Sequence, residues 1–413
     1  MPERTRVPIL ALFAADAISL VGNAMAFLAI PWFVLDETGS PGLAGTALFF
    51  TFLPTAIAAF LGGAIVDRLG FRTTSVVGDV ASGASVAVIP LLHVTVGIEL
   101  WQLFALVFLG ALLDAPGSTA RRSLLPDVAE LAGMRLERAS GISQAIQRGS
   151  FLVGGPLAGV LIAGAGAPNV LWLDAATFAV SAALVAALVP RPRPAEEQPE
   201  PAGYLADLVE GLHFVWRDRL IRAVVLTVLV TNFLDAPAGV LLPVFAREAF
   251  GSAIHLGLML GTFGGFAVLG SLAFSAIGHR LPRRRTFVVC FFVAAFPYVA
   301  LSTLPSLPVT LVLMAGWGLA AGPINPLLAT AAYERIPAAM RGRVLGATTA
   351  GAWMAIPLGA LLGGVVVEVI GIGPTLLAIG LCYLAVTGYG LVNPAFRELD
   401  RRRPEVGLEA ATR

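Results

Sequence analysis

The sequence contains no lysine, so all 27 of its basic residues are arginine, and charged residues make up only 13% of the chain. The absence of lysine excludes a Walker A nucleotide-binding loop, a Schiff-base enzyme and a retinal pigment, each of which needs that side chain. Two cysteines and four scattered histidines form no disulfide framework, metal site or nucleophile constellation. We therefore expect no enzyme activity, no cofactor, no metal and no nucleic-acid partner.

Long apolar segments are what the chain has in abundance. Hydrophobic residues make up 57% of it, and largely apolar windows of 18 or more residues recur along almost the whole length. Twelve spans are predicted, at about residues 8–35, 45–66, 75–95, 101–120, 140–163, 170–189, 223–246, 256–278, 286–304, 308–331, 344–367 and 373–392. The sequence thus predicts an all-α membrane protein with twelve transmembrane helices.

The arginines are distributed unevenly among the segments between these spans. With the N-terminus inside, 25 of the 27 fall in cytoplasmic segments, while Arg247 lies outside and Arg148 lies within a span. Such an excess of positive charge marks the cytoplasmic side. Together with the arginine, alanine and glycine usage of a GC-rich genome, this predicts a bacterial cytoplasmic membrane protein with both termini in the cytoplasm.

The longest polar stretch, residues 190–222, divides the chain into two halves. Its front half is rich in proline and glutamate and predicts an extended linker. From Tyr204 to Arg217 apolar residues recur at helical spacing, which predicts an amphipathic helix on the cytoplasmic membrane face. We expect helical bundles at 1–189 and 223–396, and a cytoplasmic tail at 397–413.

The two halves carry an internal repeat. When the chain is shifted by 212 positions, residues 23–74 align with 235–286 without a gap, and 14 of the 52 pairs are identical. Six spans separate the copies, so the two six-helix bundles have the same orientation in the membrane. This predicts a pseudo-twofold axis along the membrane normal and a substrate site between the halves.

Asp235 is the only charged residue in the apolar run 223–246. It lies near the predicted midplane, where an ionised side chain costs at least about 2.5 kcal/mol. Thr227, Thr231 and Asn232 share its helix face, and the repeat aligns it with Asn23. We predict a site that couples transport to protonation. The alternative is a structural, protonated aspartate that bonds another helix.

Three further charges are candidates for proton coupling. Asp114 lies about seven residues from the cytoplasmic end of its span, and Arg148 lies about 15 Å into another. Since a buried arginine keeps its charge, we predict a structural or gating pair between these two residues. Asp16 shares a helix face with Asn23 and Phe27, which predicts cavity lining and a second proton carrier.

Other acids have a structural interpretation. Asp79 is expected to bond the loop arginines, and Asp174 and Glu368 are expected to be solvated near the outer ends of their spans. Polar and aromatic residues of spans one, seven and eight are expected to line a cavity for apolar cargo, although most aromatic residues in a span face lipid or neighbouring helices. These cavity candidates are Asn23, Phe27, Phe33, Thr231, Asn232, Phe233, Phe263 and Phe266.

Two motifs resemble elements of the major facilitator superfamily. The loop GGAIVDRLGFR matches the signature of that family at Gly63, Asp67, Arg68, Gly70 and Arg72, while a phenylalanine replaces one basic residue. The resemblance implies a conformational latch; the alternative is topology anchoring alone.

The second motif is GGPLAG at 154–159. It resembles the antiporter G-P-x-x-G-G element at Gly155, Pro156 and Gly159, and we interpret it as a tight-packing device.

Further stretches, including SLLPD at 123–127 and RIPAAMRGRVLG at 335–346, are similar to bacterial Tap-type multidrug efflux pumps and the related enterobactin exporters. This resemblance covers nearly the whole chain. It implies a monomeric secondary exporter of amphipathic or lipophilic small molecules in exchange for protons, by alternating access. A siderophore or other metabolite exporter and, less readily, a non-transporting membrane receptor are the alternatives.

Overall fold

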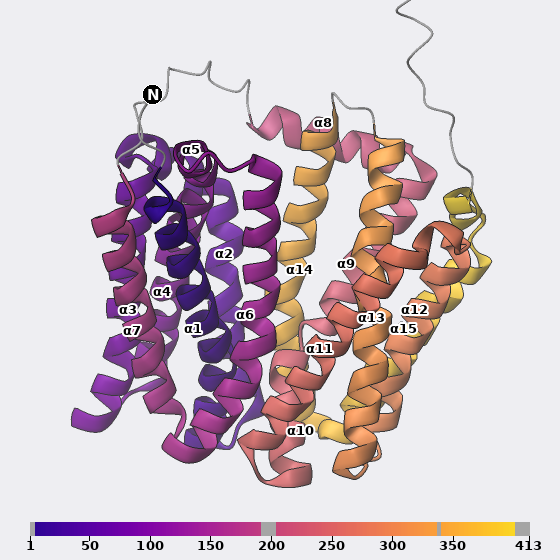
Figure 1. Ribbon diagram of the computed structural model, residues 1–413. Helices are drawn as coiled ribbons and strands as arrows, with labels where there is room; N and C mark the ends of the chain where they lie inside the picture. Colours follow the sequence, from indigo (N-terminus) through magenta and orange to yellow (C-terminus); the bar gives the residue numbers. More distant parts are fainter. Residues whose placement is uncertain (1–4, 191–203, 337–339, 401–413) are drawn as a thin grey trace, which may run out of the picture. The chain divides into compact units, whose positions relative to one another are not determined.

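The computed structural model describes residues 5–190, 204–336 and 340–400. Within these ranges the backbone alone is described for residues 56, 58–68, 204–208, 279, 329, 331–334, 341, 342, 345, 347, 349, 350, 352, 353 and 400. Every regular element of the described chain is a helix (Figure 1).

The first half of the chain supplies one helix for each of the first six predicted spans. They are α1 (Val7–Thr38), α2 (Pro41–Leu69), α3 (Phe71–Thr95), α4 (Leu100–Ser123), α6 (Leu136–Ala165) and α7 (Ala167–Leu188), with the short α5 (Leu125–Leu131) between α4 and α6. Several of these helices extend beyond the apolar runs, because an α-helix continues through polar residues at its ends.

The second half supplies the remaining spans. They are α9 (Arg219–Asp235) with α10 (Ala238–Phe250), α11 (Ala253–Ile277), α12 (Arg283–Leu301), α13 (Leu307–Arg335), α14 (Arg341–Ile370) and α15 (Ile372–Val392); short elements are α8 (Tyr204–Arg217), η1 (Gly278–Arg280) and η3 (Pro394–Asp400). Ten described stretches are long and apolar enough to cross a membrane, with α9 and α10 counted as one and α4 and α5 counted as one. The predicted all-α, twelve-span architecture is confirmed.

The 212-residue repeat also holds at the level of helix boundaries. α1 covers residues 7–38, and α9 with α10 covers 219–250, which is the same interval shifted by 212. Both intervals end at a glycine in the left-handed conformation, Gly39 with φ +68° and Gly251 with φ +66°. The copies differ after Asp235, where Pro237 stands in place of Met25 and the helix breaks. Proline lacks the backbone N–H that would continue the helix.

The described residues pack as two compact units, which differ from the two halves of the sequence. The first unit lies within Met1–Pro199, Ala236–Gly261 and Ile356–Ile372, and the second within Glu200–Asp235, Thr262–Ala355 and Gly373–Arg413. The first unit therefore contains α1 to α7 together with α10, the start of α11 and the end of α14. The predicted division into bundles at 1–189 and 223–396 stays a prediction.

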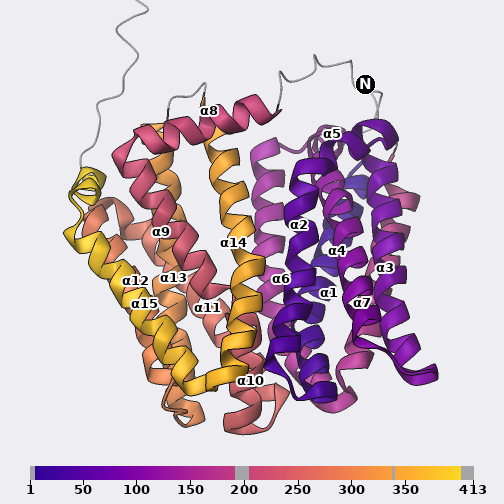
Figure 2. The ribbon, with the colours of Figure 1, turned by 180° about the vertical axis from the view of Figure 1, so that it is seen from behind.

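In the first unit α1 is the central helix. It packs mainly against α7, α6 and α2, and α3 packs against α4 and α7 (Figures 1 and 2). α1 is mostly apolar and most of its residues are buried, as expected of a helix that has several neighbours. This packing brings the polar residues of α1 against α4 and α7.

In the second unit α8 lies across the ends of α9 and α14 (Figure 2). Its bounds match the predicted amphipathic segment. Val215 is buried against Ile221, Ile336 and Val344, whereas Trp216 on the other face is 58% exposed. The predicted helix is therefore present, and its two faces differ in burial.

Candidate functional site

A polar cavity of about 290 Å³ lies among the helices of the first unit. Its walls come from α1, α2, α4 and α6. The lining residues are Asp16, Ser19, Leu20, Asn23, Thr55, Asp114, Ala115, Ser118, Thr119, Arg121, Arg122 and Gln147. Two of the four predicted coupling residues, Asp16 and Asp114, thus lie at one cavity.

Arg121 of α4 forms a buried ionic network beside this cavity. The side chain is only 2% exposed, and its Nη2 donates to Asp79 Oδ1 at 2.9 Å. Nε lies 3.5 Å from Asp16 Oδ1, and Nη1 donates to the hydroxyl of Ser181. Ser181 in turn donates to Asp79 Oδ2 at 2.7 Å. The network connects α1, α3, α4 and α7, and it satisfies the charge of a buried guanidinium with two carboxylates.

Asp114 has a different environment, although it lies on the same helix as Arg121. Its Oδ2 accepts a hydrogen bond from Asn23 Nδ2 at 3.3 Å, and its buried Oδ1 has no partner among the described residues. Arg121 is directed at Asp16 and Asp79 instead. A carboxylate with one long hydrogen bond is poorly stabilised in apolar surroundings, and taking up a proton removes that cost.

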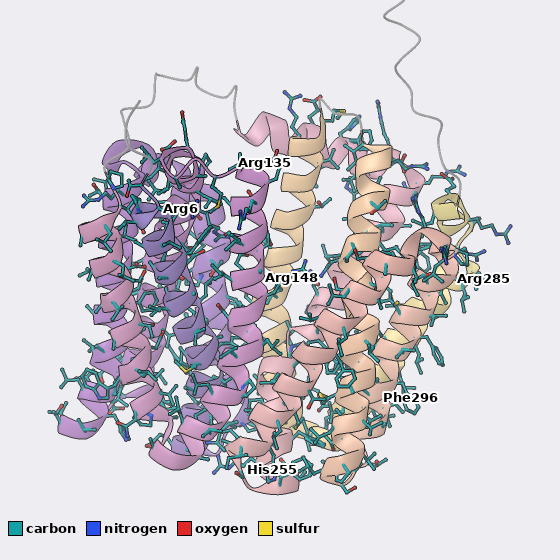
Figure 3. All side chains as sticks on the ribbon, in the orientation of Figure 1. Arg6, Arg135, Arg148, His255, Arg285 and Phe296 are labelled. Carbon is teal, nitrogen blue, oxygen red and sulfur yellow. The ribbon has the colours of Figure 1, made fainter. Side chains whose placement is uncertain are left out.

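The predicted pair between Asp114 and Arg148 is replaced by the hydrogen bond from Asn23. α4 packs mainly against α3 and α2, whereas α6, which carries Arg148, packs mainly against α1 and α7. Arg148 is exposed, and it lies between the end of the unit that carries Arg6 and Arg135 and the opposite end, where His255 lies (Figure 3). Counting residues from the span ends predicted a similar membrane depth for Asp114 and Arg148, but α4 and α6 pack mainly against different helices.

The second unit holds a separate polar cluster, made of Asp235, Tyr298 and Tyr383, at the break after α9. Asp235, the last residue of α9, accepts one hydrogen bond at each carboxylate oxygen, from the hydroxyls of Tyr298 and Tyr383, both at 2.9 Å. The two tyrosines are almost fully buried, and Asp235 itself is partly exposed. Trp317 packs on Tyr298 with ring centroids 4.8 Å apart. Two aromatic donors therefore fix the orientation of one carboxylate.

The predicted cavity residues are distributed over both units. In the first unit, Asn23 lines the cavity, Phe27 packs on Phe52, and Phe33 is 3% exposed and packs against His93. In the second unit, Thr231 is buried, Phe263 packs on Trp317, and Asn232, Phe233 and Phe266 are partly buried. Phe33 is thus a core residue in this structure.

The predicted latch is described only in part. The side chains of Gly63, Asp67 and Arg68 lie outside the described part of the chain, so their role stays a prediction. Gly70 has φ +77° at the start of α3, a conformation that favours glycine. Arg72 donates to the main-chain carbonyl of Ala186 near the end of α7.

The GGPLAG motif makes a close helix crossing. A Cβ on Gly159 would lie 2.6 Å from the carbonyl oxygen of Ala253, and Pro156 touches Gly257 and Gly261 of α11. A Cβ on Gly155 would lie 3.2 Å from Leu260 Cβ, which is closer than ordinary packing distance. These contacts support the packing interpretation of the motif.

Two acids differ from the sequence expectation. Asp79 bonds Arg121 rather than the loop arginines, and Asp174 is 1% exposed rather than solvated. Glu368 is exposed, as expected, and it accepts hydrogen bonds from the hydroxyl of Ser40 at 2.6 Å and the N–H of Gly42 at 2.8 Å. Each of them meets a helix that is distant in sequence, which one-dimensional spacing does not reveal.

The sequence analysis assigned no site role to Arg121, Tyr298 and Tyr383. Arg121 directly follows the predicted span 101–120 and adjoins Arg122, so its position along the chain gave no sign that it is buried. The tyrosines had a usable signal, since the chain has only five and three of them, Tyr298, Tyr383 and Tyr389, fall in apolar spans of the half that contains Asp235.

Twelve apolar helical spans and ionised residues buried between them are typical of a polytopic membrane transporter. The family model of the Major Facilitator Superfamily matches residues 12–360 and 229–411. The chain therefore belongs to the major facilitator superfamily, a superfamily of transporters, and within it to the group that includes the Tap pumps.

Curated relatives cover nearly the whole chain. The multidrug efflux pump Tap of Mycobacterium tuberculosis is 33% identical over 405 residues, which are 97% of this chain and 96% of that protein. Tap of Mycolicibacterium fortuitum is 32% identical over 97% of this chain and 99% of its own. Macrolide efflux protein A of Streptococcus pyogenes is 22% identical over 94% of this chain and 96% of its own.

Solved structures of low sequence identity share the fold. The nucleoside transporter NupG superposes with a TM-score of 0.78 at 11% identity, and covers 94% of this chain and 99% of its own. A POT family transporter superposes with a TM-score of 0.72 at 12% identity, over 95% of this chain and 96% of its own. These matches confirm the transporter fold.

Proposed function

We propose that the chain is a secondary active exporter of amphipathic or lipophilic small molecules, driven by protons that move in the opposite direction by alternating access. It acts as a monomer in the bacterial cytoplasmic membrane, with both termini in the cytoplasm. The full-length similarity to proteins named as multidrug and macrolide efflux pumps supports this function. The asymmetry of the arginines supports the orientation.

The environment of Asp114 is the observation that carries the proton coupling. This carboxyl group lines a polar cavity, its Oδ1 has no partner among the described residues, and the adjacent cation is engaged by Asp16 and Asp79. Protonation of Asp114 removes a poorly compensated charge, and deprotonation restores it. A group of this kind can bind a proton in one conformation and release it in the other.

Proton flow supplies the driving force in this scheme. An inward proton adds roughly 2.3 kcal/mol per 100 mV to the export of a neutral cargo. The chain has no lysine and therefore no Walker A loop that would supply energy from a nucleotide. Arg121 stays charged throughout, since a guanidinium does not release its proton, and it holds α1, α3, α4 and α7 together around the cavity.

Asp235 is a second candidate for proton coupling in this scheme, and both of its oxygens accept hydrogen bonds from tyrosines. We rank Asp114 ahead of Asp235, because Asp114 lines the polar cavity and has an oxygen without a partner among the described residues. The aromatic rings around Asp235 favour lipophilic cargo that is neutral or weakly cationic.

Transport in proteoliposomes tests this function. Purified protein is reconstituted, and the movement of a fluorescent cationic dye and of a macrolide is followed with an imposed pH gradient. We expect transport against the cargo gradient that stops when an ionophore collapses the pH gradient. A transport rate that is the same with and without the ionophore would exclude proton coupling. Transport of a ferric siderophore, without transport of the dye or the macrolide, would show that the protein is a metabolite exporter instead.

A further inference from the structure

The apolar residues of the amphipathic helix α8 include a stripe that the described part of the chain leaves exposed. Val209, Leu212 and Trp216 are 64%, 41% and 58% exposed. They follow one another at i, i+3 and i+7, so they share one face of the helix. A continuous exposed apolar stripe of this kind marks a surface that binds a partner.

A second side of α8 is fixed to the helices of its own unit. Val215 is buried in an apolar cluster with residues of α9 and α14. A Cβ on Gly211 would lie 2.5 Å from the main-chain carbonyl oxygen of Arg343, so the backbones of α8 and α14 are in contact. Arg222 Nη1 donates to the carbonyl oxygen of Trp216 at 2.9 Å, which fixes the last turn of α8 to α9. These contacts hold α8 in one rotation about its axis and leave the apolar stripe outside the contact with α9 and α14.

The third side of α8 is polar. Glu210, His213 and Arg217 also follow one another at i, i+3 and i+7, and all three are exposed. A helix with one side on protein, one apolar side and one polar side fits the boundary between lipid and water. Its depth agrees with that position, because a single residue separates α8 from α9, and α8 lies across the ends of α9 and α14 (Figure 2). Tryptophan side chains such as that of Trp216 are enriched at this boundary.

The charges beside the stripe favour an acidic lipid. Arg217 and Arg219 lie at the end of α8; both are exposed, and neither forms an ion pair within the described ranges. Asp218 between them is already engaged, since it accepts hydrogen bonds from Arg335 at 2.8 Å and from a backbone N–H at the start of α9. Glu210 on the polar side is paired with an arginine of α14. Two positive charges beside an apolar stripe attract a ligand that combines acyl chains with a negative headgroup.

We propose that Val209, Leu212 and Trp216 of α8 bind an acidic phospholipid from the leaflet at this end of the spans. The acyl chains lie on the apolar stripe, and Arg217 and Arg219 attract the phosphate group. Because α8 is fixed to α9 and α14, the bound lipid holds the ends of both helices at the membrane surface. The site uses none of the residues that we assign to proton coupling or to cargo, so lipid binding can fail while the proposed function stands, and the reverse.

Quenching of a fluorescent label tests the lipid site. The dye NBD is attached to the cysteine of Leu212→Cys or of His213→Cys, in a Cys382→Ser background, because the other native cysteine, Cys290, is buried. The full-length protein is placed in vesicles of phosphatidylcholine and phosphatidylglycerol, in which one lipid or the other carries brominated acyl chains. At position 212 we expect quenching by brominated lipid and protection from aqueous iodide, and at position 213 the reverse. Brominated phosphatidylglycerol should quench position 212 more strongly than brominated phosphatidylcholine at the same mole fraction. Val209→Cys provides a second label site on the stripe.

Charge variants test the preference for an acidic headgroup. Arg217→Gln and Arg219→Gln should each lower the preference for phosphatidylglycerol over phosphatidylcholine by roughly five-fold. Arg138→Gln is the matched control, because Arg138 is an exposed arginine at the start of α6, and it should leave the preference unchanged. Equal quenching by the two brominated lipids would refute the acidic phospholipid. Iodide quenching as strong at position 212 as at position 213 would show that the stripe faces water. Protection of position 212 from both quenchers would show that protein covers it, and either result refutes the lipid site.

Discussion

Gly159 of α6 and Gly257 of α11 cross so closely that a Cβ on Gly159 would lie 2.8 Å from the Cα of Gly257. A second crossing joins Gly45 of α2 to Gly364 of α14, where a Cβ on Gly45 would lie 3.0 Å from the Cα of Gly364. The 212-residue repeat aligns Gly45 with Gly257, so each copy contributes one of these glycines. Small residues at such positions allow two backbones to approach inside a membrane.

A larger side chain at Gly159 is expected to destabilise the first crossing. Gly159→Val places its Cβ within 2.6 Å of the carbonyl oxygen of Ala253, so the helices must separate, at a cost of about 1–3 kcal/mol. We expect a lower melting temperature in detergent and slower cargo transport. Gly164→Ala on the same helix is the control, because nothing lies within 4 Å of the added Cβ. Equal melting temperatures for the two variants would contradict the close crossing.

The hydrogen bonds to Asp235 make a second prediction. Tyr383→Phe removes the donor to Asp235 Oδ2 and leaves that oxygen unsatisfied, at a cost of about 1–2 kcal/mol in the free energy of unfolding. The same substitution in an Asp235→Ala background should cost less, because the acceptor is already gone. Tyr389→Phe is the control, since Tyr389 is 46% exposed. A Tyr383→Phe cost that is the same in both backgrounds would show that the bond contributes nothing.

Two arginine pairs in the second unit are expected to differ in strength. Arg335 is 14% exposed, and its Nε donates to both oxygens of Asp218, at 3.0 and 2.8 Å, while its Nη2 donates to Glu398. Arg343 pairs with Glu210, and both side chains are at least 40% exposed. Arg335→Gln should lower the free energy of unfolding by about 2–4 kcal/mol, because two carboxylates lose their shared cation. Arg343→Gln should cost less than about 1 kcal/mol.

The effect of added salt on stability should also differ between Arg335→Gln and Arg343→Gln. It screens exposed charges and should reduce the small effect of Arg343→Gln, whereas the effect of Arg335→Gln should persist. Melting curves at low and high ionic strength measure both effects. An Arg335→Gln variant as stable as Arg343→Gln would contradict the assigned difference in burial.

The helical spans were predictable from sequence because the bilayer leaves few choices. A chain in lipid must satisfy its backbone hydrogen bonds internally, so long apolar runs become helices. The repeat was visible in the sequence because some of its identical residues meet a local backbone requirement. One such pair is Gly39 and Gly251, which end corresponding helices in the left-handed conformation. The break after Asp235 was not predicted because the run 223–246 is long enough for one continuous helix and Asp235 is its only charge, although Pro237 marks the place.

The pairings inside the membrane were much less predictable. Sequence depth placed Asp114 near Arg148, but the rotation of α4 turns Asp114 toward Asn23 of α1. Arg121 directly follows the predicted span 101–120, yet it is buried between Asp16 and Asp79. Which helices become neighbours, and which faces they turn to each other, depends on the packing of many side chains at once, and no local pattern in the sequence encodes it.

Proton movement through Asp114 is the central claim, and a pH-sensitive dye inside proteoliposomes measures it directly. A cargo gradient is imposed without any initial pH difference, so that a proton signal can arise only from coupled exchange. Wild type and the control Ser123→Ala, whose hydroxyl donates to the Thr119 carbonyl of its own helix and lies outside the cavity lining, should both move protons against the cargo flow. Asp114→Asn should exchange cargo without any proton signal; an undiminished proton signal in this variant would contradict the account.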